Sequence, residues 1–155
     1  MARIITGALP AAPNGHLTDL RAGHGPRAIL AMHSADCIGC RDYVRGIAND
    51  PDLSAWGGHL TIIVRDSLDT ATKLYEQLHR CAQVLADPGH SVAIADGSLA
   101  VTDEWGEVYF ETTVDTEHQL PPPPEVVNWV RFIAIQCPEC VGVEGDWRFL
   151  SEGDG

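Results

Sequence analysis

The chain has 155 residues, of which 45% are hydrophobic and 21% are charged, so it is long and apolar enough to fold as one domain. Ten lysines and arginines stand against 22 aspartates and glutamates, which gives a net charge of −12. That charge would repel a phosphate backbone and an anionic lipid surface. Neither nucleic acid nor a membrane is therefore an expected partner.

No stretch of the sequence has the pattern of a membrane span or a secretory leader. The apolar run at residues 28–32 has the length of a strand and is far shorter than the ~18–20 residues of a span. Gly7 and Pro10 interrupt the first residues before an apolar leader segment can form. We therefore expect a cytoplasmic protein.

The hydrophobic pattern predicts strands and helices that alternate along the chain and end in a hairpin and a helix. Residues 1–27 are rich in glycine and proline, which predicts an irregular lead-in with one short strand at 3–6. Four prolines at 121–124 predict a stiff approach to the last helix. The other expected elements are strands at 28–33, 60–64 and 84–86, helices at 40–48, 67–82 and 125–135, and a hairpin of 99–102 with 107–111.

This order of elements predicts an α/β fold. Strands joined through helices pair in parallel by right-handed crossovers, and the hairpin adds antiparallel strands. We expect a central mixed sheet of four or five strands with helices on both faces. The domain would span residues 1–140, and a flexible acidic tail would follow at 141–155.

Four of the five cysteines form two Cys-x-x-Cys pairs, one of Cys37 and Cys40 and the other of Cys137 and Cys140. In a cytosolic chain this spacing favours redox or metal chemistry over structural disulfides. The fifth cysteine, Cys81, falls on the apolar face of a predicted helix and is expected to be a buried thiol.

The first pair lies where a predicted central strand ends and the next helix begins. The free N–H groups and the dipole of a helix N-terminus stabilise negative charge, so this position favours the thiolate of Cys37. Cys40 lies one turn further along the helix and could attack a mixed disulfide formed on Cys37. The pattern therefore predicts Cys37 as the nucleophile and Cys40 as the resolving thiol.

The strand and Cys-x-x-Cys helix that begin at residue 28 resemble the active-site segment of the thioredoxin superfamily. The turn at Asp87-Pro88 and the following hairpin are similar to the redoxin or peroxiredoxin branch, and the resemblance covers residues 3–135. It implies a thioredoxin-like redoxin domain with thiol oxidoreductase activity and no cofactor or metal. The implied substrate is a protein disulfide or a peroxide, and a thiol reductant is the implied second partner.

The chain departs from both families at the groups that assist the thiol. In the peroxiredoxin pattern Pro-x-x-x-Thr-x-x-Cys, Leu30 replaces the proline, and Ser34 replaces the threonine that donates to the peroxide. The peroxiredoxin arginine has no counterpart at Ser98-Leu99. The thioredoxin cis-proline is also missing from this region. We therefore expect disulfide exchange, with modest peroxidase activity beside it.

Two further side chains are candidates for the site. His33 lies four residues before Cys37 and could transfer protons, because a histidine titrates near neutral pH. Arg65 follows the second buried strand, and in a parallel sheet it would emerge at the same edge as Cys37 and could stabilise the thiolate.

Two hypotheses without catalysis compete with the thiol oxidoreductase. The domain could sense redox state by binding a partner, or the two Cys-x-x-Cys pairs could hold zinc. Zinc sites of that kind usually separate their pairs by ~15–20 residues, whereas these pairs lie at 37–40 and 137–140. The topology also predicts that Cys137 and Cys140 lie toward the opposite pole, as a separate thiol pair.

Overall fold

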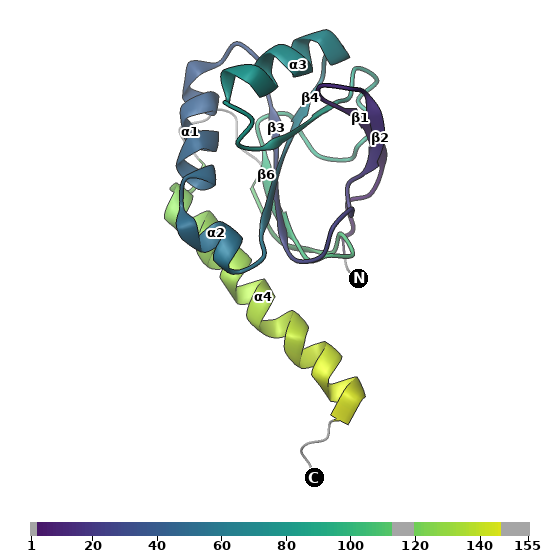
Figure 1. The fold of residues 1–155 in the computed structure, drawn as a ribbon, viewed down its shortest axis with the longest axis vertical. Coiled ribbons are helices and arrows are strands. Elements are labelled where there is room, and N and C mark those ends of the chain that lie inside the picture. Colours follow the sequence, from purple (N-terminus) through teal and green to yellow (C-terminus); the bar gives the residue numbers. More distant parts are fainter. Residues whose placement is uncertain (1–2, 113–119, 147–155) are drawn as a thin grey trace.

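The computed structural model describes residues 3–112 and 120–146, with side chains described up to residue 136. Its elements alternate much as the sequence predicts (Figure 1). They are β1 (Ala8–Ala11), β2 (His16–Asp19), β3 (Arg27–Met32), α1 (Ile38–Ala48), α2 (Pro51–Ala55), β4 (His59–Val64), α3 (Leu68–Gln77), β5 (Gln83–Ala86), β6 (Leu99–Thr102), β7 (Val108–Glu111) and α4 (Pro123–Asp146).

The strands form one mixed sheet in the order β2-β1-β5-β4-β3-β6-β7. The three central strands β5, β4 and β3 are parallel, and β6 and β7 add to β3 in antiparallel pairing, as predicted. The sheet has seven strands, so the expected four or five is wrong. The difference lies in residues 1–27, where β1 and β2 form an antiparallel hairpin at the sheet edge. The hairpin was not predicted because prolines and glycines within and between these strands are typical of irregular segments.

The expectation of helices on both faces is also wrong. The larger core contains alternate residues of β3, such as Leu30, together with residues from α1, α2, α3 and α4. On the opposite face, Ile29 packs with Leu9 and Leu20 of the N-terminal region and with Ile94. No helix residue of the described chain belongs to that second core. Because the chain moves from β3 to β4 to β5 in one direction across the sheet, right-handed crossovers place α1 and α3 on the same face.

The helix ends have local causes in the sequence. Cys37 caps α1, and its side chain accepts a hydrogen bond from the backbone N–H of Cys40. Ser67 caps α3, and its hydroxyl accepts a hydrogen bond from the backbone N–H of Thr70 at 3.2 Å. After α1, the capping residue Asp50 and the proline that follows it begin the short helix α2, which the sequence analysis had not anticipated.

The last helix, α4, is longer than predicted. It runs without a break through the second Cys-x-x-Cys pair to Asp146, whereas the predicted helix ends at residue 135 and a flexible tail was expected from residue 141. Residues 147–155 lie outside the described part of the chain. In Figure 1 the C-terminal turns of α4 extend away from the body of the protein, at the end opposite to the start of α1. None of the described helices has both the length and the hydrophobicity needed to cross a membrane.

Candidate functional site

Parallel pairing of β3 and β4 brings the predicted site residues to one edge of the sheet. Met32 pairs with Val64, so His33 and Arg65, the residues that follow them, emerge at the same carboxyl edge. A hollow of about 360 Å³ opens there. Its walls are the turn after β3, the end of β4 and the first turns of α3. The predicted location of Arg65 at this edge is thus confirmed.

Ser34 shapes the turn between β3 and α1. Its hydroxyl oxygen accepts a hydrogen bond from the backbone N–H of Asp36 at 3.2 Å, and its carbonyl oxygen accepts from the N–H of Cys37 at 3.3 Å. Serine favours such turns because its short side chain bonds to backbone two residues ahead. The turn places Cys37 at the N-cap of α1, directly before the helix begins at Ile38.

The two thiols of the first pair lie in different surroundings. Cys37 is half-buried, and its sulfur accepts a hydrogen bond from the backbone N–H of Cys40 at 3.2 Å. Cys40 is 2% exposed and lies in the larger core. A nucleophile needs access and a resolving thiol needs protection until a mixed disulfide forms, so the exposures match the predicted roles.

His33 joins the pair directly. Its Nδ1 lies 3.5 Å from the Cys40 sulfur, within the reach of a hydrogen bond to sulfur. The ligand atoms of His33, Cys37 and Cys40 all lie within 4.8 Å of one another, and neither cysteine forms a disulfide with another described cysteine. The structure therefore brings together the predicted proton-transfer residue and both predicted thiols.

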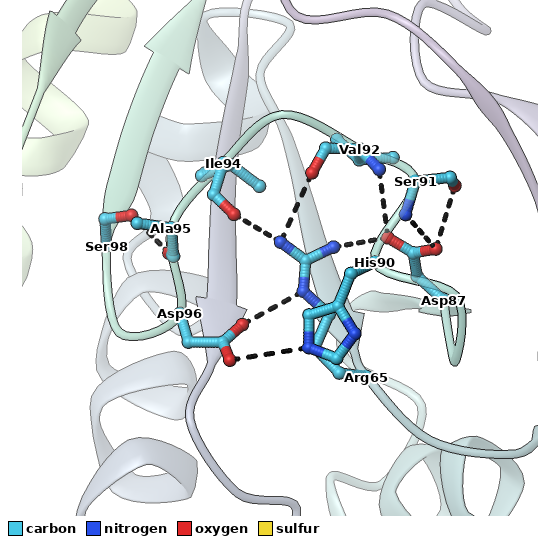
Figure 2. Close-up of polar contacts among 9 residues, drawn as sticks. All are labelled: Arg65, Asp87, His90, Ser91, Val92, Ile94, Ala95, Asp96 and Ser98. Carbon is cyan, nitrogen blue, oxygen red and sulfur yellow. Dashed lines mark hydrogen bonds and ion pairs between the residues drawn. The ribbon is translucent and has the colours of Figure 1, made fainter.

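Arg65 occupies a different environment from the one its position suggested (Figure 2). Its guanidinium forms an ion pair with Asp87, and its Nε donates to Asp96 at 3.0 Å. Its Nη2 donates to the carbonyl oxygens of Ile94 and, at 3.4 Å, of Val92. These contacts hold the segment 87–96 against the end of β4, and they direct the arginine's donors toward that segment.

Asp87 completes this network from the other side. It is 2% exposed and accepts from the backbone N–H groups of Ser91 and Val92 and from the Ser91 hydroxyl. Burial by itself would raise the pKa of Asp87, but these hydrogen bonds and the charge of Arg65 hold the pKa below its ordinary value. The carboxylate is thereby kept charged, as a partner of a buried guanidinium must be.

Sequence reasoning missed the partners of Arg65. Asp87 was recognised only as part of a turn, and Asp96 carried no signal in the pattern. The segment then continues into β6, and Ala31 of β3 bonds to it through Gly97 and Ser98. A buried arginine at a strand end implies a carboxylate partner, and that requirement was the one clue available.

The remaining cysteines lie away from this edge. Cys81 is exposed and precedes β5, at the opposite end of the parallel strands, so the expectation of a buried thiol is wrong. Desolvation nonetheless raises the pKa of its thiol. Cys137 and Cys140 belong to α4, and their side chains lie outside the described residues.

Comparisons with known proteins establish the fold. No family model matches the chain, and no curated protein matches it significantly. Solved structures do match over most of its length. Peroxiredoxin Q of Xanthomonas campestris is 15% identical, with 83% of this chain and 91% of that chain covered and a TM-score of 0.67. The peroxidoxin BcpB of Mycobacterium tuberculosis is 12% identical, with 87% and 96% covered and a TM-score of 0.69.

A third solved structure has a similar fold and a different description. A putative protein disulfide isomerase of Bacteroides thetaiotaomicron is 15% identical, with 83% of this chain and 86% of that chain covered and a TM-score of 0.64. The chain thus has the thioredoxin-like fold, in the form found in the redoxin and peroxiredoxin branch. The predicted fold family is confirmed.

Proposed function

We propose that this protein is a thiol–disulfide oxidoreductase that uses Cys37 as the nucleophile and Cys40 as the resolving thiol. The observation that carries the proposal is the arrangement of the two sulfurs at the start of α1, one half-buried and one buried, with His33 in contact with the second. The thioredoxin-like fold supports a redox role for a pair at this position.

The first step is attack by the Cys37 thiolate on a substrate disulfide. A bond forms between the Cys37 sulfur and one substrate sulfur, the substrate disulfide breaks, and the other substrate sulfur leaves as a thiolate that takes up a proton. The backbone N–H of Cys40 donates to the Cys37 sulfur and fixes its position before the attack. Ile38 is 66% exposed beside Cys37 and offers an apolar contact to a protein substrate.

The second step releases the reduced substrate. Cys40 gives its proton to the Nδ1 of His33 and attacks the Cys37 sulfur, so a Cys37–Cys40 disulfide forms as the mixed disulfide breaks. The departing substrate sulfur takes a proton in turn. An external thiol reductant then supplies two electrons to restore the pair, as a reducing compartment such as the cytoplasm would allow.

The same pair can reduce a peroxide. The Cys37 thiolate would attack one peroxide oxygen, the O–O bond would break, and the other oxygen would leave as an alcohol or water after taking up a proton. The sulfenic acid on Cys37 would then condense with the Cys40 thiol to give the disulfide and water. The Ser34 hydroxyl lies in the turn beside the thiol and would donate to the peroxide. Arg65 would act indirectly, as a positioning residue that fixes the segment along this edge. Because its donors are committed to Asp87, Asp96 and carbonyls, we expect the peroxide route to be the slower one.

The test is to measure both activities on the same metal-free, fully reduced protein. Reduction of insulin disulfides and of hydrogen peroxide is followed with a thiol reductant in excess, in a buffer that contains a chelator. We expect disulfide reduction that depends on Cys37 and a weaker peroxidase activity. Absence of both activities, or activity unchanged in Cys37→Ser, would contradict the proposal.

A further inference from the structure

We propose that His33, Cys37 and Cys40 also bind a thiophilic divalent cation of the zinc class, which blocks the thiol pair reversibly. This site differs from the one considered in the sequence analysis, because it needs a single Cys-x-x-Cys pair and a histidine from the end of β3. A nitrogen and two sulfur ligands are the donors that zinc prefers in proteins.

The spacing of the donor atoms fits a tetrahedral ion. With bonds of about 2.3 Å to sulfur and 2.0–2.1 Å to nitrogen, a tetrahedral centre separates a sulfur and a nitrogen by about 3.5 Å and two sulfurs by about 3.8 Å. The His33 Nδ1 lies 3.5 Å from the Cys40 sulfur, and the three ligand atoms lie within 4.8 Å of one another. A cation therefore needs only small side-chain rotations to bind all three.

The surroundings favour a cation with one open position. His33 is exposed and Cys37 is half-buried, so an ion can enter from solvent, while Cys40 anchors it from the core. The net charge of −12 raises the local concentration of cations. Three protein ligands leave the fourth coordination position to water or to an external thiol, as in zinc sites that exchange ligands.

Binding would regulate the proposed oxidoreductase without depending on it. A sulfur bound to zinc has its electron pair committed to the metal, so an occupied site cannot attack a disulfide. The redox test above is performed with a chelator, and the metal test below needs neither an oxidant nor turnover. Either proposal can therefore fail while the other stands.

The experiment uses the reduced full-length chain with Cys137→Ser and Cys140→Ser, which removes the second pair as a competing ligand set. Cobalt(II) is titrated first, because a thiolate bound to cobalt gives charge-transfer absorption in the near ultraviolet. Zinc(II) is then added in competition with a chromophoric chelator. We expect one equivalent of metal, displacement of cobalt by zinc, and protection of Cys37 from alkylation.

Two variants on this background decide the ligand set. His33→Ala changes an exposed side chain, so the fold should be retained. The zinc affinity should fall by at least about 10–100-fold, which is the loss seen when a residue that only hydrogen-bonds to a metal ligand is removed. Cys81→Ser is the matched control and should leave the affinity unchanged. Absence of saturable binding, an affinity unaffected by His33→Ala, or binding lost with Cys81→Ser would each overturn the proposal.

Discussion

Two polar regions share the carboxyl edge of the sheet, and they are built in opposite ways. The thiol turn, residues 33–40, has an exposed histidine and a half-buried cysteine. The backbone N–H of Cys40 donates to the Cys37 sulfur, and the His33 Nδ1 lies 3.5 Å from the Cys40 sulfur. The arginine clamp consists of Arg65 with Asp87 and Asp96. The side chains of Arg65 and Asp87 are only 7% and 2% exposed, and several hydrogen bonds satisfy each charge.

The difference indicates that the thiol turn serves the reaction and that the arginine clamp stabilises the fold. A group that must attack a substrate during turnover needs access to it, and the half-buried Cys37 beside the exposed His33 has that access. A buried charge without partners would destabilise the fold, so the clamp saturates its donors and acceptors. Proximity to the thiols at one edge therefore does not make Arg65 part of the reaction. Five substitutions, grouped by four expected effects, test this division from the largest effect to the smallest.

The largest effect is expected in the thiol turn. Cys37→Ser should abolish disulfide reduction, because the hydroxyl of serine is too weak a nucleophile to replace the thiolate. Cys40→Ser should retain the first step and accumulate mixed disulfides with the substrate, which non-reducing electrophoresis and mass spectrometry detect. Both variants should unfold close to the wild-type denaturant concentration. Mixed disulfides that form on Cys40 when Cys37 is absent would reverse the assignment.

The second effect concerns the stability of the clamp. Arg65→Met leaves the buried carboxylate of Asp87 without its partner, so the free energy of unfolding should fall by about 3–5 kcal/mol. Urea unfolding measures it, and the folded fraction should still form a Cys37–Cys40 disulfide. Arg41→Met is the matched control. That arginine bonds to Gln77 at the surface, and its loss should cost within about 0.5 kcal/mol. Equal losses in the two variants would refute the clamp.

The third effect is kinetic and returns to the thiol turn. His33→Ala removes the proton acceptor next to Cys40 and should slow resolution of the mixed disulfide by roughly 10²-fold, as loss of a general base does. Rapid-quench trapping of the mixed disulfide separates this step from the first attack, which should change little. A slower first attack with normal resolution would assign His33 to the other thiol.

The smallest effect is a pH-dependent one in the clamp. Ser91→Ala removes the hydroxyl that donates a hydrogen bond to the Asp87 carboxylate. The free energy of unfolding at pH 7 should fall by about 1 kcal/mol. The hydrogen bonds of Asp87 hold its pKa below the ordinary 3.8, so their contribution is present above that value and is lost as the pH falls through the folded-state pKa. The difference between variant and wild type should therefore shrink as the pH falls below 3.8. A difference that is constant down to pH 2 would contradict this.

The sequence predicted the site better than it predicted the sheet. Cys37, Cys40 and His33 lie on one strand–turn–helix unit, where local spacing fixes geometry, and the structure brings them together. The β1–β2 hairpin was missed because its pairing partner β5 is far along the chain and its own residues include Pro10 and Gly15. The hydrophobic pattern of a short segment cannot predict its pairing with a strand that lies far away in the sequence.

Arg65 shows the same limit at the scale of one side chain. Its place at the sheet edge followed from strand order, and the structure confirms it. The identity of its partners depended on how the segment 87–96 folds back over the end of β4, which no periodicity encodes. A charged residue can thus be placed at the correct sheet edge from sequence while its partners remain unpredicted.

The most direct test of the proposed redox pair is peptide mass spectrometry after one equivalent of oxidant, on metal-free protein that is first fully reduced. We predict a rapid loss of two hydrogens confined to the peptide that contains Cys37 and Cys40, with Cys81 still open to alkylation. The same result should appear in the variant without Cys137 and Cys140. Two free thiols at positions 37 and 40 after oxidation, or a disulfide from either one to another cysteine, would contradict the account.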